Sequence, residues 1–363
     1  MPPRHVAEDS ATDLTAETEG TGDLTEESDD QVDTTVADVS QEKHVVTSVD
    51  ALKAQGIPAG DIQKLQEGKI YTIEELRMTT RKQLNNIRGL SETKVDKILA
   101  AADKIGQSYI QDGLQALEDR KNILKITTGS TELDALLQGG IESKCITEVF
   151  GEFRCGKTQL CHTLAVTAQL PRSKKGGGGR VLFIDTEKTF LPEKIKQIAQ
   201  RFGLDPGKVL ESITVARIFN YEQQMSCLAA VSDKLAEHKY SLVIIDSITA
   251  LFRTDFKGRG ELAERQQNLG QHLATLSKVA HAHNLAVFIT NQVMAQVDGA
   301  AMFTADPKKP IGGHILAHAS TTRLYFRKGR GETRVAKVFS SPYLPEAEAT
   351  FAIAAEGIID ATE

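Results

Sequence analysis

The chain has 363 residues, of which 40% are hydrophobic, and this is enough for about two domains with buried cores. Its formal net charge of −6 is unevenly distributed, because residues 1–42 contain 13 acidic residues and a single arginine, which leaves a net charge of +6 on the rest. No segment has the apolar length of a membrane span or the pattern of a signal peptide, so we expect no membrane partner. The four cysteines lack C-x-x-C spacing, which indicates neither zinc nor disulfides.

Residues 1–43 form an acidic segment rich in Thr, Ser, Asp and Glu that contains no aromatic residue. Such a composition cannot bury enough surface to offset the entropy of ordering, so we expect a disordered tail. Its role is either to keep the chain soluble or to compete with nucleic acid for the basic remainder of the chain.

Residues 44–106 show helical periodicity and predict a small all-α domain. Within it, two helices over residues 81–98 meet at Gly89 in a helix-hairpin-helix pattern. The backbone N–H groups of such a turn, with Arg88 and Lys94 beside them, suit a DNA phosphate. A helical bundle used only for protein contacts is the alternative. The periodicity weakens over residues 107–122, where we expect a linker.

The stretch 146–158 is an apolar strand that leads into the pattern G-x-x-x-x-G-K-[ST], the signature of a phosphate-binding loop. Its glycines let successive N–H groups face a phosphate, Lys157 would reach the β and γ phosphates, and Thr158 would give an oxygen to Mg²⁺. Residues 159–170 continue as a helix, whose N-terminus favours an anion. The loop alone predicts a nucleoside triphosphate as ligand, and its predicted binding residues are Gly151, Glu152, Phe153, Arg154, Cys155, Gly156, Lys157, Thr158 and Gln159.

The remaining pattern over residues 123–363 predicts an α/β core. Continuous apolar runs indicate buried strands, and amphipathic helices lie between them, which is typical of a mostly parallel sheet covered on both faces. The predicted parallel strands are 181–185, 213–216, 242–246 and 286–290; shorter alternating runs at 323–327, 334–339 and 350–353 predict an antiparallel extension of the sheet.

Three polar residues follow these strands at the edge where ligands of open α/β sheets bind. Asp246 ends one strand and would hold Mg²⁺ through water. Glu187 is our candidate to orient the attacking water, since phosphoryl transfer depends on positioning, although it could instead cap the helix that follows. Gln292 would touch the γ-phosphate and report its presence to the loop behind it.

Two loops combine basic residues with glycine. Residues 253–261 include Arg253, and residues 293–313 include Phe303, Lys308 and Lys309. A loop of such length is usually functional, and this composition suits a single-stranded nucleic-acid backbone. A solvated loop is an equally good interpretation of the composition alone.

Several long stretches resemble the RecA-like recombinases of the archaeal and eukaryotic branch. They include residues 126–130, 151–158, 258–262, 305–313 and 344–348. The resemblance covers the chain from about residue 45 to its end. It implies a RecA-like P-loop ATPase core in which Lys157, Thr158, Asp246, Glu187 and Gln292 have the ATPase roles described above.

The resemblance also implies sites in the loops and at the protomer boundary. It places Arg259 and Arg265 in the first DNA loop and Val297, Phe303 and Lys308 in the second. His318 matches a histidine that couples the nucleotide state to the neighbouring protomer, and Lys194 stands where an adenine-stacking arginine is expected.

The implied function is an ATP- and Mg²⁺-dependent filament on single-stranded DNA that pairs it with homologous duplex DNA and exchanges strands. The resemblance implies a homo-oligomer, helical or a ring at rest, that works with recombination mediators in the nucleus. Sequence details favour the meiotic paralogue over the general repair paralogue. The alternatives are a paralogue that binds ATP and DNA and regulates filaments without exchanging strands, and a structural module in which nucleotide only locks the assembly.

Four residues depart from the family pattern. Ile110 stands where the docking motif has Phe, with Gly113 at its Ala position, so the protomer contact would bury less area. Ser340 replaces an Asp in the segment that caps the neighbour's nucleotide, and Lys194 replaces an Arg that stacks better. Cys155 replaces a Thr, and we expect nearby Lys157 to lower its pKa and make the thiol prone to oxidation.

Overall fold

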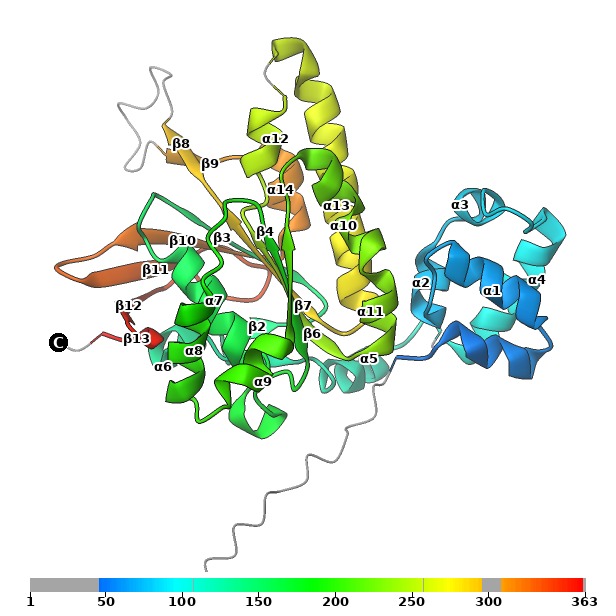
Figure 1. Cartoon of the computed structure of the whole chain (residues 1–363), viewed down its shortest axis with the longest axis horizontal. Coiled ribbons are helices and arrows are strands. Elements are labelled where there is room, and N and C mark those ends of the chain that lie inside the picture. Colours follow the sequence, from blue (N-terminus) through cyan, green and yellow to red (C-terminus); the bar gives the residue numbers. More distant parts are fainter. Residues whose placement is uncertain (1–45, 107, 257, 296–307, 362–363) are drawn as a thin grey trace, which may run out of the picture. The chain divides into compact units, whose positions relative to one another are not determined.

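The structure is a computed structural model that describes residues 46–361 except 107, 257 and 296–307. The predicted acidic tail lies outside the described residues. Residues His44–Glu363 form one compact unit, whose helices and strands are labelled in Figure 1. Within the described part, no helix has both the length and the apolarity to cross a membrane.

Five short helices come first and share a hydrophobic cluster of their own. They are η1 Val49–Gln55, α1 Ala59–Glu67, α2 Ile73–Met78, α3 Arg81–Asn85 and α4 Glu92–Ile105. Leu52, Leu76 and Ile98 are among the buried residues of this cluster. Both α2 and α3 start with a capping box, at Thr72 and Thr80, which satisfies N–H groups that a short helix otherwise leaves free. The periodicity over residues 44–106 therefore did predict helices.

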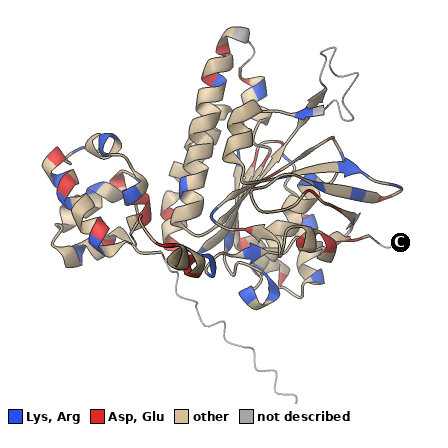
Figure 2. Ribbon diagram, turned by 180° about the vertical axis from the view of Figure 1, so that it is seen from behind, with Lys and Arg blue, Asp and Glu red and all other residues tan. Residues whose placement is uncertain are grey.

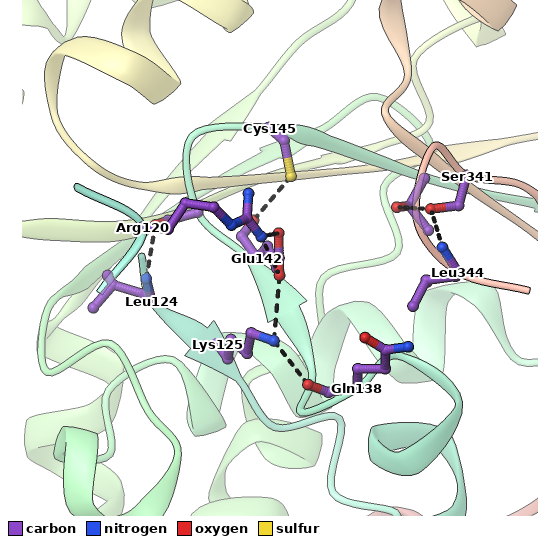
Figure 3. Close-up of polar contacts among 10 residues, drawn as sticks. Arg120, Leu124, Lys125, Gln138, Glu142, Cys145, Ser341 and Leu344 are labelled. Carbon is purple, nitrogen blue, oxygen red and sulfur yellow. Dashed lines mark hydrogen bonds and ion pairs between the residues drawn. The ribbon is translucent and has the colours of Figure 1, made fainter. Parts of the chain in front are cut away.

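A helix, α5 (Gly113–Arg120), occupies part of the predicted linker over residues 107–122. The Asp112 side chain caps the N-terminus of α5, because it accepts from the backbone N of Gln115 at 2.8 Å. The weak apolar periodicity of this stretch gave no indication of a helix. The last residue of α5 is Arg120 (Figure 3), and its Nη2 lies 3.4 Å from both carboxylate oxygens of the buried Glu142. Lys125 Nζ lies 3.3 Å from the same carboxylate. The C-terminal end of α5 is therefore anchored to the core.

The core is a nine-stranded sheet in the order β13-β12-β11-β10-β3-β7-β6-β4-β5. Strands β10, β3, β7, β6, β4 and β5 pair in parallel, while β10 to β13 pair antiparallel. This confirms the predicted α/β fold with an antiparallel extension; β13 was not predicted. The strands of this sheet are β3 Ile146–Gly151, β4 Arg180–Asp185, β5 Ile213–Arg217, β6 Tyr240–Asp246, β7 Ala286–Asn291, β10 Thr322–Lys328, β11 Thr333–Ser340, β12 Glu348–Ala354 and β13 Gly357–Asp360.

Two small two-stranded sheets lie outside the large one. Strand β1 (Lys125–Ile126) pairs antiparallel with β2 (Ile141–Glu142), and β8 (Val293–Ala295) pairs antiparallel with β9 (Lys308–Pro310). The second pair brings together the two ends of the predicted DNA loop, whose residues 296–307 lie outside the described residues. The two ends of the predicted DNA loop are therefore held side by side by the pairing of β8 with β9.

Helices cover both faces of the large sheet (Figure 1), and each face has its own hydrophobic cluster. One layer consists of α6 Thr131–Leu136, α7 Lys157–Thr167, α8 Pro192–Arg201 and α9 Pro206–Glu211. The other consists of α10 Tyr221–Ala230, α11 Ser232–Glu237, α12 Ala250–Thr254, α13 Leu262–Ala282 and α14 Gly313–Ala319. Helix α13 is mostly uncharged along its length (Figure 2), as expected of a helix that packs on the sheet.

Strand β6 is buried along its whole length, as its continuous apolar run predicted. Burial of each of its large side chains, such as Leu242 and Ile244, stabilises the fold by roughly 2 kcal/mol. The strand ends at Asp246, so this carboxylate is carried by one of the most firmly packed elements of the molecule.

Candidate nucleotide and DNA site

The phosphate-binding loop joins β3 to α7 and depends on its two glycines. A Cβ on Gly151 would lie 2.2 Å from the Phe326 carbonyl oxygen, and Gly156 has a φ of 101°, a conformation that favours glycine. The Lys157 Nζ curls over the loop and donates to the carbonyl oxygens of Gly151 at 2.9 Å and Glu152 at 2.8 Å. The ammonium group therefore lies over the concavity in which the motif holds phosphates.

The rest of the loop is open to a ligand. Phe153 is 87% exposed, and the Arg154 guanidinium carbon lies 5.4 Å from the centre of its ring. Gln159 follows in the first turn of α7, and its side-chain oxygen has no hydrogen-bond partner among the described residues. Phe153 and Arg154 are exposed, whereas the Gln159 side-chain oxygen is buried, and the ATP-binding role of all three stays a prediction.

Asp246 is the buried acidic centre of the site. Its Oδ2 accepts from Thr158 Oγ1 at 2.7 Å and from Thr189 Oγ1 at 3.1 Å, and its Oδ1 accepts from Thr290 Oγ1 at 2.5 Å. Burial raises the pKa of Asp246, which these hydroxyl donors oppose. The sequence predicted the approach of Thr158 to Asp246 but missed Thr189 and Thr290, because no motif marks these two threonines.

Thr158 and Asp246 together form a site that fits a magnesium ion. Mg²⁺ prefers oxygen ligands and keeps several waters, so one hydroxyl, one nearby carboxylate and the phosphates of the nucleotide suit it. Thr158 would hold the ion directly and Asp246 through water. The bound ion would neutralise charge on the β and γ phosphates. In the described part of the chain, no cluster of three or more His, Cys, Asp or Glu side chains offers another metal site.

Glu187 and Gln292 meet at the open side of the site. Glu187 Oε1 accepts from Ser247 Oγ at 2.8 Å and from Gln292 Nε2 at 2.7 Å. Arg253 Nη1 donates to the other end of the Gln292 amide at 2.8 Å. The structure thus brings together the predicted water-orienting residue, the predicted phosphate sensor and a predicted DNA-binding residue, and sequence reasoning had not linked the last to the first two.

A buried network that sequence analysis missed lies beneath Gln292. The Asn291 Nδ2 donates to Glu148 Oε1 at 2.8 Å and to the Ile311 carbonyl oxygen at 2.7 Å. Glu148 pairs with Arg323, whose Nε lies 2.6 Å from Oε2. All three side chains are buried, so the charge of Glu148 is compensated by Arg323 and by the Asn291 amide rather than by bulk water. The network joins the phosphate-loop strand to the end of the predicted DNA loop.

His162 ties the phosphate-loop helix to the segment that carries Glu187. Its Nδ1 lies 2.8 Å from the Thr158 carbonyl oxygen, and its Nε2 accepts from the Leu191 backbone N at 3.1 Å. An accepting Nε2 requires the proton to be on Nδ1, so the two contacts define the tautomer. Burial lowers the pKa of His162, which favours this neutral form.

Two predicted ATP-binding residues, Lys194 and His318, have partners outside the phosphate-binding loop in the single chain. Lys194 Nζ donates to the Ala354 carbonyl oxygen at 2.8 Å, and burial lowers its pKa. His318 is exposed on α14, where its ring stacks near that of His314 at 6.3 Å between centroids. Their roles, and that of the exposed Ser340 at the end of β11, stay predictions about a site completed by a second copy.

The expectation of a reactive Cys155 is wrong. The thiol is only 2% exposed, and burial raises its pKa although Lys157 Nζ lies 3.7 Å from its sulfur. The attraction between thiolate and ammonium is outweighed by the loss of hydration, since a charged sulfur in an apolar site is costly. The motif fixed the spacing of Cys155 and Lys157, but gave no measure of how deeply the sulfur lies.

The predicted DNA-binding residues of the core are only partly described. Arg253 is exposed on α12, and Lys309 is exposed in β9 opposite Met294. Arg265, in the first turn of α13, has a buried Nε without a hydrogen-bond partner among the described residues. For Arg259 in η3 (Arg259–Glu261) and for Lys308 only the backbone is placed. Val297 and Phe303 lie outside the described residues.

The predicted helix-hairpin-helix turn has an ion pair at its base. Gly89 has a φ of 85°, and its carbonyl oxygen accepts from Lys64 Nζ at 3.0 Å. Lys94 Nζ lies 2.8 Å from Asp61, a bond that lowers the pKa of this carboxyl. Arg88 is exposed. Because charges of both signs are mixed over α1 to α4 (Figure 2), the DNA-binding role of Arg88, Gly89 and Lys94 stays a prediction.

The predicted protomer-docking residues are exposed. Ile110 is 74% exposed and precedes Gly113, the first residue of α5. Tyr109, Leu114 and Leu117 nearby are also more than half exposed. An apolar cluster of this kind on a segment anchored at its other end suits contact with another protein surface.

Comparison with known proteins identifies the family. The Rad51 family profile matches residues 119–361, two thirds of the chain. The chain therefore belongs to the Rad51 family. It is 54% identical to a meiotic recombination protein DMC1 homologue of Glycine max over 326 residues, 90% of this chain and 94% of that protein. Against the Arabidopsis thaliana homologue the identity is 55% over 323 residues, 89% of this chain and 94% of that protein.

A third relative, DMC1 homologue B of Oryza sativa subsp. japonica, is 54% identical over 325 residues, 90% of this Rad51-family chain and 94% of the relative. The matches extend well beyond the phosphate-binding loop, which many unrelated ATPases share. They confirm the predicted resemblance to RecA-like recombinases, including the preference for the meiotic branch.

Proposed function

We propose that this chain is an ATP-dependent recombinase that assembles on single-stranded DNA, pairs it with homologous duplex DNA and exchanges strands, acting in meiosis in the nucleus. The observation that carries the proposal is the hydrogen bond from Thr158 of the phosphate-binding loop to Asp246, whose neighbour Ser247 donates to Glu187, in a chain of the Rad51 family. Meiotic recombination is named in the descriptions of its relatives.

In this proposal each residue has one task. Lys157 and the loop N–H groups bind the β and γ phosphates of ATP, and Thr158 with Asp246 holds Mg²⁺. Glu187 orients a water so that its oxygen attacks the γ-phosphorus while the bond to the β–γ bridging oxygen breaks. Gln292 contacts the γ-phosphate. Such catalysis requires positioning and charge stabilisation, which a preformed site supplies.

The proposal includes a second copy of the chain as partner. The exposed Ile110 and Gly113 would dock on the neighbouring protomer, and His318 and Ser340 would face the nucleotide of that neighbour. DNA would lie along the loops that contain Arg253, Arg259, Arg265, Val297, Phe303, Lys308 and Lys309. Duplex DNA would also contact Arg88, Gly89 and Lys94. Recombination mediators would assist loading.

A joint-molecule assay tests the proposal. The full chain, with ATP and Mg²⁺, should join single-stranded DNA to a homologous duplex and not to a heterologous one. Lys157→Ala should abolish both joint molecules and ATP hydrolysis, since it removes the charge that binds the phosphates. DNA-stimulated hydrolysis without joint molecules would instead indicate a regulator of filaments that does not exchange strands.

A further inference from the structure

Three side chains at the open edge of the nucleotide site form one continuous hydrogen-bonded row. The Arg253 guanidinium donates to Gln292 Oε1 at 2.8 Å, and Gln292 Nε2 donates to Glu187 Oε1 at 2.7 Å. These three residues, with Ala250 and Thr254, line a cavity of about 400 Å³. A residue on the helix that leads into the first predicted DNA loop is therefore one side chain away from the residue that would orient water.

The row has a fixed direction. An amide presents a donor at its nitrogen and an acceptor at its oxygen, so a carboxylate on one side and a guanidinium on the other admit one orientation of Gln292. Glu187 Oε1 also accepts from Ser247 Oγ at 2.8 Å, so both acceptor positions of this oxygen are filled. The contacts hold the carboxylate against Ser247 and Gln292.

The backbone beside Gln292 is fixed as well. The Ile311 backbone N donates to the Gln292 carbonyl oxygen at 3.0 Å, and the buried Asn291 side chain holds the Ile311 carbonyl oxygen at 2.7 Å. These bonds hold the backbone of residues 291 and 292 to that of Ile311. Gln292 can therefore leave Glu187 only by rotation of its side chain. Among the described residues, the exposed Arg253 alone donates to the outer end of that side chain.

We propose that Arg253 is a positioning residue which, in the absence of DNA, holds Gln292 on Glu187, and that a DNA backbone phosphate releases Glu187 by binding Arg253. This inference rests on the proposed function. A phosphate is a charged acceptor that can bind guanidinium through two oxygens, whereas the Gln292 oxygen is neutral and single, so the phosphate is the stronger partner. Once Arg253 turns to DNA, Gln292 is free to leave Glu187 and contact the γ-phosphate.

Steady-state ATP hydrolysis by the full chain, with and without a saturating single-stranded oligonucleotide, tests the relay. Arg253→Met keeps the length of the side chain and removes its donors. It should raise the DNA-free kcat about fivefold, the equivalent of one hydrogen bond, with the KM for ATP unchanged and the stimulation by DNA lost. Arg253→Lys, which retains a donor, should keep the DNA-free rate low and preserve part of the stimulation.

Arg172→Met serves as the control, because Arg172 is an exposed arginine beyond the far end of α7, and it should leave the DNA-free rate at the wild-type value. An unchanged DNA-free kcat in Arg253→Met would overturn the relay even if DNA stimulation were lost, since Arg253 would then only bind DNA. A failure of the proposed function is distinct: the wild-type chain itself would hydrolyse ATP equally with and without DNA, which would overturn the relay too.

Discussion

Asp246 and Glu187 lie at the same edge of the sheet, yet their surroundings differ. Asp246 is 2% exposed and accepts from three threonine hydroxyls, whereas Glu187 is exposed and is held through one oxygen by Ser247 and Gln292. A buried charge requires a complete set of partners, while an exposed one can exchange a partner for water or ligand at little cost. The comparison indicates that the metal side of the site is preformed and the water side adjustable.

Among the changes that test this comparison of Asp246 and Glu187, Glu187→Gln should have the largest effect. The amide keeps the size of the side chain but cannot take a proton from water, so kcat should fall about 100- to 1,000-fold with little change in the KM for ATP. Glu193→Gln, at an exposed position at the start of α8, is the matched control. If kcat were unchanged, Glu187 would be left with the alternative role of a helix cap.

His272 extends the comparison to a buried group without partners. It lies within α13 at 1% exposure, neither ring nitrogen has a hydrogen-bond partner among the described residues, and burial lowers its pKa to about 4. The folded state disfavours the proton, so stability is lost as the pH falls below the unfolded pKa of about 6.5 toward 4.

His272→Met should therefore abolish this loss. Relative to wild type, the free energy of unfolding of the variant should increase by roughly 2 kcal/mol between pH 7 and pH 5, as measured by urea unfolding. His281→Met, an exposed change on the same helix, controls for the loss of a histidine. A constant difference between His272→Met and wild type at the two pH values would show that His272 is hydrated or partnered in solution.

Thr290→Val tests the preformed side. Valine keeps the shape of threonine but leaves Asp246 Oδ1 without its donor, so the pKa of Asp246 should rise further and Mg²⁺ should bind about tenfold more weakly. A magnesium titration of ATP hydrolysis measures this, and the acid limb of the pH profile should move to higher pH. Thr214→Val on β5, which loses a contact with the Tyr240 hydroxyl far from Asp246 in the sheet order, should do neither.

The smallest expected effect concerns the exposed docking segment. Ile110→Phe adds apolar area at a position that is 74% exposed in the single chain, so self-assembly should begin at a concentration about fivefold lower. Sedimentation of the DNA-free chain measures this threshold. Leu117→Phe, also exposed on α5, controls for general stickiness. Equal thresholds for Ile110→Phe and wild type would show that Ile110 is not the docking residue.

Periodicity and motif spacing predicted the features that depend on local sequence. The parallel strands were predicted because continuous apolar runs such as 242–246 can only be buried. Lys157, Thr158 and Asp246 could be placed together because strands of a parallel sheet present their carboxyl ends to one edge. Residues 223–237 have the sequence pattern of one amphipathic helix, but the structure divides this stretch at Val231, between α10 and α11.

Features that depend on how deeply a side chain is buried, or on the direction in which it points, could not be predicted from the sequence. The reversed expectation for Cys155 came from its burial, which spacing does not encode. The contacts of Thr189 and Thr290 with Asp246, and of Arg253 with Gln292, join residues 39 to 57 positions apart through rotamer choices. No motif marked Thr189 or Thr290, and the pattern that marked Arg253 as a DNA-binding residue gave no sign of its contact with Gln292.

The buried pair of Glu148 and Arg323 constrains how this sequence can change over evolutionary time. Replacing either residue alone leaves an uncompensated charge in the centre of the sheet, at a cost of about 3 to 5 kcal/mol, a large part of the stability of a typical domain. An apolar replacement of both at once can be neutral. A chain that changes one residue at a time from the ion pair to the apolar pair therefore passes through an unstable single variant. Descendants of this chain would retain Glu148 and Arg323 whether or not the pair contributes to recombination.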